Sequence, residues 1–295
     1  MATRFIAALL LSSIWAAPAV AQDVDTPALV QGVHLEVVPE GQHQELRLRD
    51  GSRLFGRVTR ITDETVIFRT LAGAEVTIPR AEITFLEVVK GEVVGGEIRP
   101  VDANTTRLLF GPTGRSLKQG EGYIGVYEFM MPFVQVGVTD RISIGAGTPL
   151  VFGSGTSHPV WITPKVHFIS TGRLDVSAGA MHFFNVDDAT VGIAYTVMTY
   201  GTPDSAFTAG AGYAYEGNDD DYSAGSVVVM VGGERRLSRR TKLVTENYWF
   251  EGNDGIASLG LRFIGDRLSA DLGLVVPITE DEFFAFPIVN FVWTF

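Results

Sequence analysis

The chain has 295 residues and carries 23 lysines and arginines against 34 acids, a formal net charge of -11. An acidic chain repels phosphate backbones, which argues against a nucleic-acid partner. It contains no cysteine, so disulfide scaffolds, thiolate metal sites and cysteine nucleophiles are excluded. Its apolar content of 46% and its 33 glycines, together with many short alternating runs, favour a folded all-β chain.

Residues 1–21 have the features of a secretory signal peptide. Arg4 gives a positive start, Phe5–Ala17 is mostly apolar, and Ala19–Ala21 is a small-x-small cleavage site. The apolar part is too short for a spanning helix, so we expect cleavage before Gln22. No later stretch is long and apolar enough to form a helical membrane span.

Residues 22–43 are expected to form a linker, and residues 44–90 a small β module. Turn-forming sequences such as Asp50-Gly51-Ser52 separate short runs of alternating apolar and polar residues, which predicts strands. So many short strands in so short a span favour a small five-stranded barrel. The predicted strands cover residues 45–49, 53–61, 66–71, 75–79 and 84–89.

The start of this module, L-R-L-R-D-G-S-R-L-F-G-R-V followed by D-E-T-V-I-F, resembles the opening of Sm-like and SH3-like small barrels. Its seven arginines would suit an RNA-binding surface. Alternatively, strand arginines cover apolar faces and pair with neighbouring groups. Because a module behind a signal peptide is expected in the periplasm, we prefer the second interpretation and predict no nucleic-acid partner.

Residues 91–104 are interpreted as a connector, and residues 105–295 as a transmembrane antiparallel β-barrel. Most strands predicted there have the length that a tilted strand needs to cross the hydrocarbon core, whereas strands of soluble sandwiches are usually shorter. The ten strands after Asp140 are 141–150, 158–169, 173–183, 189–200, 206–215, 224–234, 241–250, 256–264, 267–277 and 284–295.

Two further strands precede these, and the sequence leaves two arrangements open. In one, Thr106–Gly111 pairs with a long strand 121–138. In the other, Tyr123–Met130 and Phe133–Val138 form a hairpin. Both give a barrel of about twelve strands, an even number as expected of a single-chain outer-membrane barrel.

Side-chain alternation gives most of these strands one apolar face for lipid and one polar face for the lumen. In strand 267–277 the leucines fall on one side and Asp271 on the other. Strand 241–250 fits neither side, because Lys242 and Glu246 share a face with apolar residues.

The C-terminal residues Phe291, Trp293 and Phe295 place three aromatic side chains on one face of the last strand. This ending resembles the strand that bacterial outer-membrane barrels present to their assembly machinery, so we predict that it is an assembly signal. With Phe295 at the periplasmic rim, short turns fall on the periplasmic side and longer loops outside, as in other such barrels.

The predicted outer loops contain many acids and no lysine or arginine. A ring of carboxylates there would attract cations, either solutes or divalent ions that bridge lipopolysaccharide. The alternative is ordinary turn chemistry, and since no EF-hand spacing is present, no dedicated metal site is predicted. The candidate cation-binding residues are Glu216, Asp219, Asp220, Asp221, Glu251 and Asp254.

Five residues on the predicted polar faces are candidates for lining the lumen. His167 is expected to face Asp175 across a three-residue turn, and Lys165 lies on the same face as His167. Arg262 is expected to lie diagonally to Asp271 across a two-residue turn, close enough to pair. Charge pairs in a barrel of this size plug the lumen more readily than they catalyse a reaction.

Enzymatic motifs are missing from the sequence, which has no GxSxG, HExxH or GxxxxGK[ST]. An outer-membrane lipid hydrolase would need a serine beside a histidine at the lipid face. The alternation points His182 outward, but no serine is placed as its partner. We therefore predict no enzymatic activity and no cofactor.

Three motifs in residues 107–148 resemble a family of bacterial outer-membrane proteins without an assigned activity. They are Phe110–Thr113, Lys118–Tyr123 and Gly137–Gly145, in that order. The resemblance implies a membrane barrel and brings no catalytic residue with it.

The sequence thus predicts a periplasmic β module joined to an outer-membrane barrel that is structural or forms a narrow pore for small solutes. The second hypothesis is a binding or anchoring protein with a plugged lumen, whose periplasmic module engages a partner. The third is a lipid-modifying enzyme. The expected partners are outer-membrane lipid, lipopolysaccharide and the barrel-assembly machinery.

Overall fold

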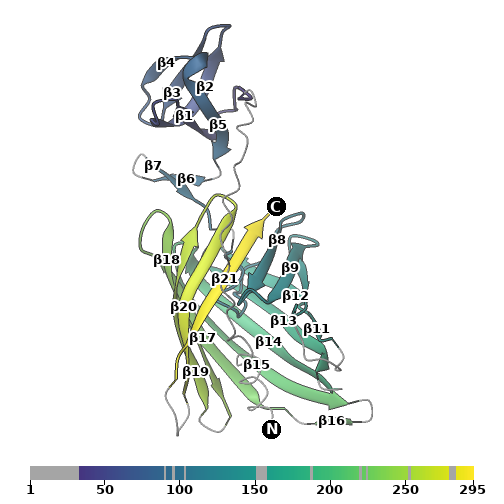
Figure 1. Cartoon of the computed structure of the whole chain (residues 1–295). Coiled ribbons are helices and arrows are strands. Elements are labelled where there is room, and N and C mark those ends of the chain that lie inside the picture. Colours follow the sequence, from purple (N-terminus) through teal and green to yellow (C-terminus); the bar gives the residue numbers. More distant parts are fainter. Residues whose placement is uncertain are drawn as a thin grey trace, which may run out of the picture. The chain divides into compact units, whose positions relative to one another are not determined.

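The computed structural model describes two compact units, one ending at Val101 and one beginning at Asp102 (Figure 1). The predicted signal peptide and the first part of the predicted linker lie outside the described residues. The structure describes residues 33–89, 91–94, 97–102, 104–150, 158–186, 189–218, 221–223, 225–251, 254–278 and 284–295.

The first unit contains a five-stranded antiparallel sheet in the order β4-β3-β2-β1-β5. Its turns form where the sequence predicts them: Gly51 has a φ of 85°, and the Ser52 amide donates to the Asp50 carboxylate over 2.8 Å, a contact that lowers the pKa of Asp50. The strands are β1 (His43–Leu48), β2 (Arg53–Ile61), β3 (Thr65–Thr70), β4 (Glu75–Pro79) and β5 (Ile83–Val89), with a 3-10 turn at Arg80–Glu82 before the last.

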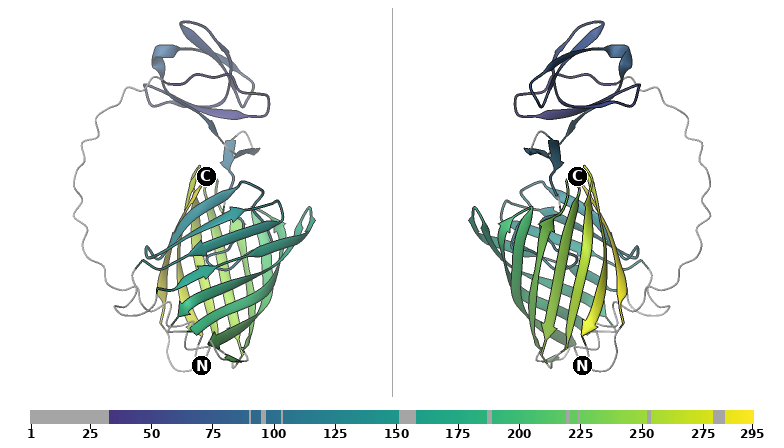
Figure 2. Two further views of the ribbon diagram at one scale, coloured as in Figure 1. Left: turned by 90° about the vertical axis from the view of Figure 1, so that its right-hand side faces the viewer. Right: turned by 90° about the vertical axis from the view of Figure 1, so that its left-hand side faces the viewer.

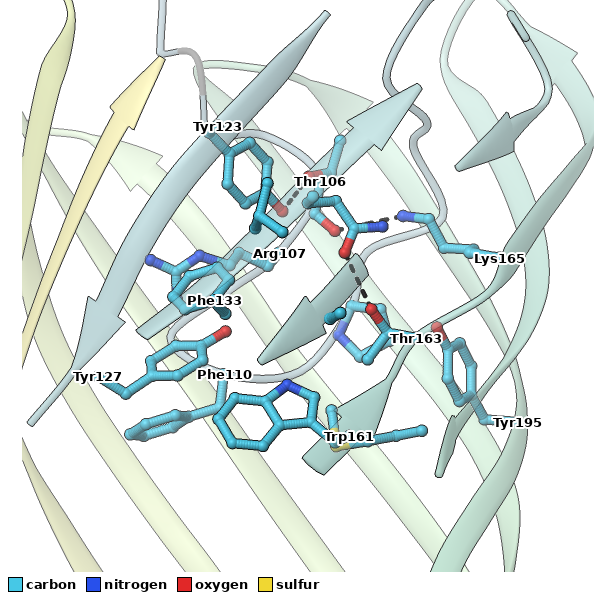
Figure 3. Close-up of a pocket in the computed structure, with 15 residues that line it drawn as sticks. Thr106, Arg107, Phe110, Tyr123, Tyr127, Phe133, Trp161, Thr163, Lys165 and Tyr195 are labelled. Atoms are coloured by element: carbon cyan, nitrogen blue, oxygen red, sulfur yellow. Dashed lines mark hydrogen bonds between the residues drawn. The ribbon is translucent and has the colours of Figure 1, made fainter. Parts of the chain in front are cut away.

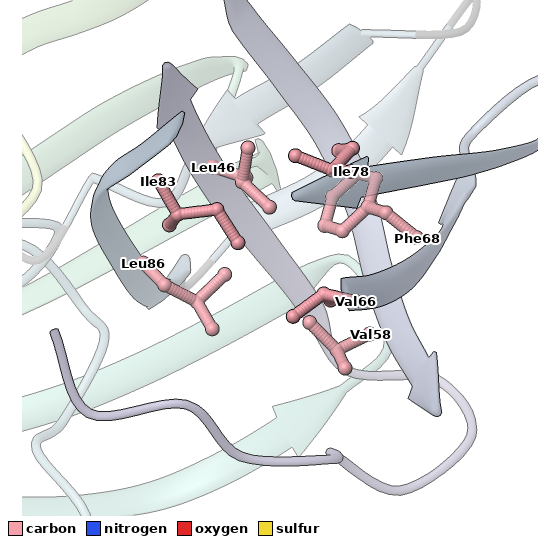
Figure 4. Close-up of a cluster of buried hydrophobic side chains, with 7 residues drawn as sticks. All are labelled: Leu46, Val58, Val66, Phe68, Ile78, Ile83 and Leu86. Atoms are coloured by element: carbon pink, nitrogen blue, oxygen red, sulfur yellow. The ribbon is translucent and has the colours of Figure 1, made fainter. Parts of the chain in front are cut away.

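Alternation along these strands sends one apolar set inward to form the core of the module (Figure 4). Phe68 and Val58 are fully buried at its centre. The core residues are Leu46, Val58, Val66, Phe68, Ile78, Ile83 and Leu86. Five short strands are thus held by one small core, as the periodicity predicts, while the likeness to Sm-like barrels stays a resemblance in sequence.

The connector predicted at 91–104 contains regular structure. Residues Gly91–Val94 (β6) and Glu97–Pro100 (β7) pair as an antiparallel hairpin. Ile98 is buried, although Val93 and Val94 are exposed. The sequence interpretation missed this hairpin because its two strands are only four residues long and its glycines suggested a linker.

The second unit is a closed antiparallel barrel of twelve strands in the described residues, with β11 and β12 together forming one interrupted strand (Figures 1 and 2). Pairing of β21 with β8 and of β9 with β10 closes the ring. The strands are β8 (Gly122–Tyr127), β9 (Met131–Gly137), β10 (Ile142–Gly147), β11 (Val160–Ile162), β12 (Lys165–Thr171), β13 (Leu174–Val186), β14 (Ala189–Thr202), β15 (Ser205–Asn218), β16 (Asp221–Ser223, paired only at the end of β15), β17 (Val227–Arg236), β18 (Thr241–Phe250), β19 (Gly255–Ile264), β20 (Leu268–Ile278) and β21 (Phe286–Thr294).

The predicted all-β fold class is confirmed, and the structure decides between the two arrangements at the start of the barrel. β8 and β9 form the hairpin of the second arrangement. The first arrangement is wrong, because residues 106–111 contribute only an isolated bridge between Arg107 and Pro112. The loop predicted at 184–188 is also shorter than expected, since β13 and β14 leave only residues 187–188 between them.

We call the end of the barrel that carries Phe295 the inner end and the opposite one the outer end. Large apolar side chains such as Leu259, Leu272 and Leu274 are about half exposed on the outside wall. Exposed aromatic side chains mark both rims of this band, as in barrels that cross a membrane. At the inner end they are Phe168, Tyr200, Phe207, Phe263 and Trp293, and at the outer end Phe184, Tyr213 and Trp249.

No helix in the described parts of the chain is long and apolar enough to cross a membrane.

Candidate functional site

The interior of the barrel is filled by a segment of the chain that precedes β8. We call Asp102 and residues 104–117 the plug segment. Its deepest part is a tight turn in which the Leu108 amide donates to the Gly111 carbonyl and the Thr113 amide to the Thr106 carbonyl, both over 2.9 Å. The chain then returns to the inner end, where the Gly120 amide meets the Gly137 carbonyl. The plug segment therefore reaches into the lumen and back out on the same side.

The tip of the plug segment is held by one carboxylate of the wall. Glu246, fully buried on β18, accepts hydrogen bonds from the backbone amides of Leu109, Phe110 and Gly111 at 2.8, 3.0 and 2.9 Å. Tyr248 donates a further bond over 2.7 Å. Three convergent amides form a concave anion site, and here the wall itself supplies the anion.

Two leucines beside the tip pack against the apolar part of the wall. Leu108 and Leu109 are buried together with Val244, Val275 and Ile288. These contacts explain the mixed face of strand 241–250. The face points inward, Lys242 and Glu246 bind the plug segment, and Val244 packs on the two leucines.

A chain of buried ion pairs fixes the base of the plug segment to β17 and β18. The Lys242 ammonium lies 2.7 Å from the Asp102 carboxylate and 2.8 Å from Glu234. The second oxygen of Glu234 pairs with Arg115 on the returning arm. All four side chains are at least nine-tenths buried, so each charge depends on its partner, because an unpaired buried charge is strongly unfavourable.

Arg262 on β19 is the second centre of this network. Its Nε donates to Asp271 over 2.7 Å, and Nη1 donates to the Asn104 carbonyl over 2.8 Å and approaches Asp102 at 3.4 Å. Nη2 donates to the carbonyl of Leu108. One guanidinium thus joins the wall to both ends of the descending arm, using the several donors that make arginine suited to such sites.

The returning arm is fixed to the opposite wall. The Lys165 ammonium on β12 donates to the carbonyls of Thr106, Thr113 and Arg115. Gly114 runs so close to β13 that an added Cβ would lie 2.2 Å from the Asp175 carbonyl oxygen. A side chain larger than hydrogen at Gly114 would therefore force the plug segment away from the wall.

The structure places all five predicted lumen residues inside the barrel, with two changes in register. Arg262 lies directly opposite Asp271 instead of diagonally, because the turn between β19 and β20 is longer than two residues. His167 lies opposite Ser177, yet its Nε2 still reaches the Asp175 carboxylate over 3.1 Å, since an irregularity shifts β12 by one residue just beyond it.

The described residues among the predicted cation-binding set do not form a metal-binding group. Asp219 and Asp220 lie outside the described residues, as does the side chain of Asp221 in β16. Glu216 lies near the end of β15, and Glu251 and Asp254 flank the loop after β18. Within the described ranges, no group of three or more histidine or acidic side chains is arranged to hold a metal ion.

A cavity of about 60 Å³ remains between the plug segment and the wall formed by β8 to β14 (Figure 3). Aromatic rings line much of it, and the Thr163 hydroxyl donates to Gln135 across it over 3.0 Å. The Arg107 guanidinium lies over the rings of Tyr127 and Phe133 at 4.9 and 5.4 Å. This volume holds a few water molecules at most. The cavity is therefore a small remaining space in a lumen that the plug segment closes.

The proposed assembly signal lies along the seam where the barrel closes. β21 pairs with β8 from Asn290–Tyr127 to Thr294–Tyr123. Trp293 and Phe295 are about half exposed on the outside wall, and the Phe295 amide bonds to the Gly122 carbonyl over 3.1 Å.

Sequence reasoning missed most residues of the site: Asp102, Arg107, Arg115, Glu234, and the roles of Lys242 and Glu246. The one available indication was the face of strand 241–250, which suited neither lipid nor a water-filled lumen.

Comparisons with known proteins give no matching family model and no matching curated sequence. Among solved structures, the KdgM porin in complex with disordered oligogalacturonate is 6% identical, with 59% of this chain and 98% of that one covered and a TM-score of 0.46. The NanC porin is 10% identical, with 59% and 98% covered and a TM-score of 0.41. A loop-deletion form of OmpT, an outer membrane protein of Vibrio cholerae, is 11% identical, with 86% and 96% covered and a TM-score of 0.37. The fold is assigned from the strand pairings of this chain and not from these similarities.

Proposed function

We propose that this chain is an outer-membrane barrel whose lumen is a passage for small solutes, closed at rest by the plug segment. The observation that carries the proposal is the polar character of the interface between the plug segment and the wall. Glu246, Lys242, Arg262 and Lys165 bind the plug segment through hydrogen bonds and ion pairs. Such a wall remains wettable when the plug segment is absent, as the lumen of a pore must be.

Two further features support a plug segment that can leave. It is a single stretch of chain that reaches in from one end, so its departure breaks no strand pairing of the barrel. Within the described residues, the two buried side-chain atoms without a hydrogen-bond partner are Asn104 Nδ2 and Asn290 Oδ1. Both lie at this interface, which marks it as less completely satisfied than the wall.

Replacing residues 102–117 with an equally long Gly/Ser segment is expected to convert a closed barrel into a conducting one. The new segment retains none of the charges or leucines that hold the plug in place. Single-channel recording in planar bilayers measures the result: wild-type protein is mostly closed, and the replaced variant shows steady openings. A variant that retains the band shift of a folded barrel on unheated gels but does not conduct would contradict the proposed passage.

The apolar outside band supports the location in a membrane. Leu272→Arg is expected to destabilise the barrel by about 2–4 kcal/mol, because a charge near the middle of the lipid face must leave water. Unfolding by urea in lipid vesicles measures the loss. Asp266→Arg in the exposed turn after β19 serves as the control and should change stability little; equal loss in both variants would argue against a lipid-facing wall.

The second candidate is an anchor with a permanently closed lumen, which presents the N-terminal module to a partner in the periplasm. The buried ion pairs favour it, because every wall charge that touches the plug segment finds a compensating group there. Single-channel recording separates the two candidates, since an anchor shows no openings under any condition.

The third hypothesis, a lipid-modifying enzyme, depended on His182. The His182 Nδ1 lies 2.7 Å from the Tyr215 hydroxyl, and its ring packs edge-to-face with the ring of Phe184. These contacts suit a rim of aromatic side chains.

The partners follow from the same proposal. The outside band would contact outer-membrane lipid and lipopolysaccharide, the C-terminal aromatic residues would be read by the assembly machinery, and the five-stranded module would lie in the periplasm.

A further inference from the structure

Opening the lumen as proposed above changes the charge of its wall. Arg236 lies opposite Lys242 near the inner rim and is neutralised by Asp204 of the adjacent turn. Apart from that pair, the charged side chains of the described strands that face the lumen between the two rims are three cations, Lys165, Lys242 and Arg262, and four carboxylates, Asp175, Glu234, Glu246 and Asp271. The plug segment contributes Asp102, Arg107 and Arg115. The plugged interior is therefore neutral, and the bare wall has a net charge of -1.

Two of the wall pairs do not depend on the plug segment. Lys242 pairs with Glu234 on the neighbouring strand at 2.8 Å. Arg262 pairs with Asp271 at 2.7 Å, and the two residues lie directly opposite each other on β19 and β20. These four charges continue to neutralise one another in an open barrel.

The remaining three wall charges behave differently. Lys165 on β12 donates to carbonyls of the plug segment, and Asp175 on the adjacent β13 accepts from His167 and Ser170. These two opposite charges lie on neighbouring strands. Glu246 lies on β18, in another part of the wall, and the three backbone donors that stabilise it all belong to the plug segment.

Loss of the plug segment thus leaves Glu246 as a carboxylate in the wall without a cationic neighbour of its own. Its cross-strand neighbour on β17 is Gly232, and the adjacent inward-facing residues on its own strand are Val244 and Tyr248. The outer loops add acids and no lysine or arginine in sequence, so the field at the outer mouth has the same sign. Rings or single carboxylates in a narrow lumen select cations by this field.

We propose that Glu246 is the residue that makes the opened lumen selective for small cations. This inference rests on the proposed function, because it requires a lumen that conducts. The same carboxylate then has two roles: it binds the tip amides in the closed state and attracts cations in the open state.

The test uses the full chain with residues 102–117 replaced by the Gly/Ser segment, in a planar bilayer under a KCl gradient. The reversal potential gives the preference for potassium over chloride. We expect about a fivefold preference, the factor that one charge at contact distance supplies in water. Glu246→Gln in this background should remove most of the preference, and Glu246→Asp should retain it.

Lys165→Gln provides the matched variant of opposite sign. It removes a positive charge from the same lumen, so the preference for potassium should rise instead of fall. Glu121→Gln, in the exposed turn before β8, should leave the reversal potential unchanged.

The outcomes separate the two proposals. If the plug-replaced protein is folded but does not conduct, the proposed passage fails. If it conducts equally well for both ions, prefers chloride, or retains its preference in Glu246→Gln, the passage stands and the role of Glu246 is wrong.

Discussion

Arg262→Met is expected to release the plug segment in the otherwise intact chain. The substitution removes the ion pair with Asp271 and the bonds to the carbonyls of Asn104 and Leu108 at once. Removing one partner of a buried ion pair costs about 3–5 kcal/mol, here because Asp271 retains only a 3.5 Å contact with Arg107. The Arg262–Asp271 pair exists with and without the plug segment, but water can solvate the unpaired Asp271 carboxylate only when the lumen is open. The cost therefore falls mainly on the plugged state, which also loses the bonds to Asn104 and Leu108, and the equilibrium shifts toward the open state.

Two measurements follow this shift. Single-channel recordings should show frequent openings where wild-type protein is mostly closed, and trypsin added on the inner side should cut after Arg107 and Arg115, which are buried in the plugged state. Arg267→Met, in the exposed turn before β20, should behave as wild type. Continued closure and protection in Arg262→Met would show that this network does not hold the plug segment.

Phe68→Ala is expected to unfold the N-terminal module and leave the barrel folded. Phe68 is fully buried at the centre of the seven-residue core, and truncating a core phenylalanine costs about 3–5 kcal/mol. A core of this size rarely supplies more than about that stability in total, so one substitution is enough.

The division of the chain into two compact units allows both to be followed in one sample. Limited proteolysis should degrade residues 43–89 in the variant, while the barrel retains its band shift on unheated gels. Val76→Ala, at a position more than a third exposed on β4, serves as the control and should leave the module resistant. Joint loss of both units in Phe68→Ala would show that the barrel requires the folded module.

The positions of the strands were predictable because their determinants are local. Alternation at period two and glycine-containing turns depend on neighbouring residues only, and so β2 and β4 occupy the predicted residues. The outward face of strand 267–277 was predictable for the same reason, since leucines at every second position require an apolar surrounding.

Register across turns was less predictable. The pairing of Arg262 with Asp271 was expected, but its geometry depends on the number of residues in the turn, which the adjacent strands decide by their length. Local sequence carries little information on that number, because Gly265-Asp266 suits turns of more than one length.

The sequence by itself determined a β module, a barrel of about twelve strands and, for most of these strands, the side that faces lipid. Only the tertiary structure decided that Leu108 and Leu109 are core residues and that Asp102 and Glu246 hold a plug. Those contacts join residues more than a hundred positions apart, and they exist only once the ring of strands has closed and created an interior for the segment to fill.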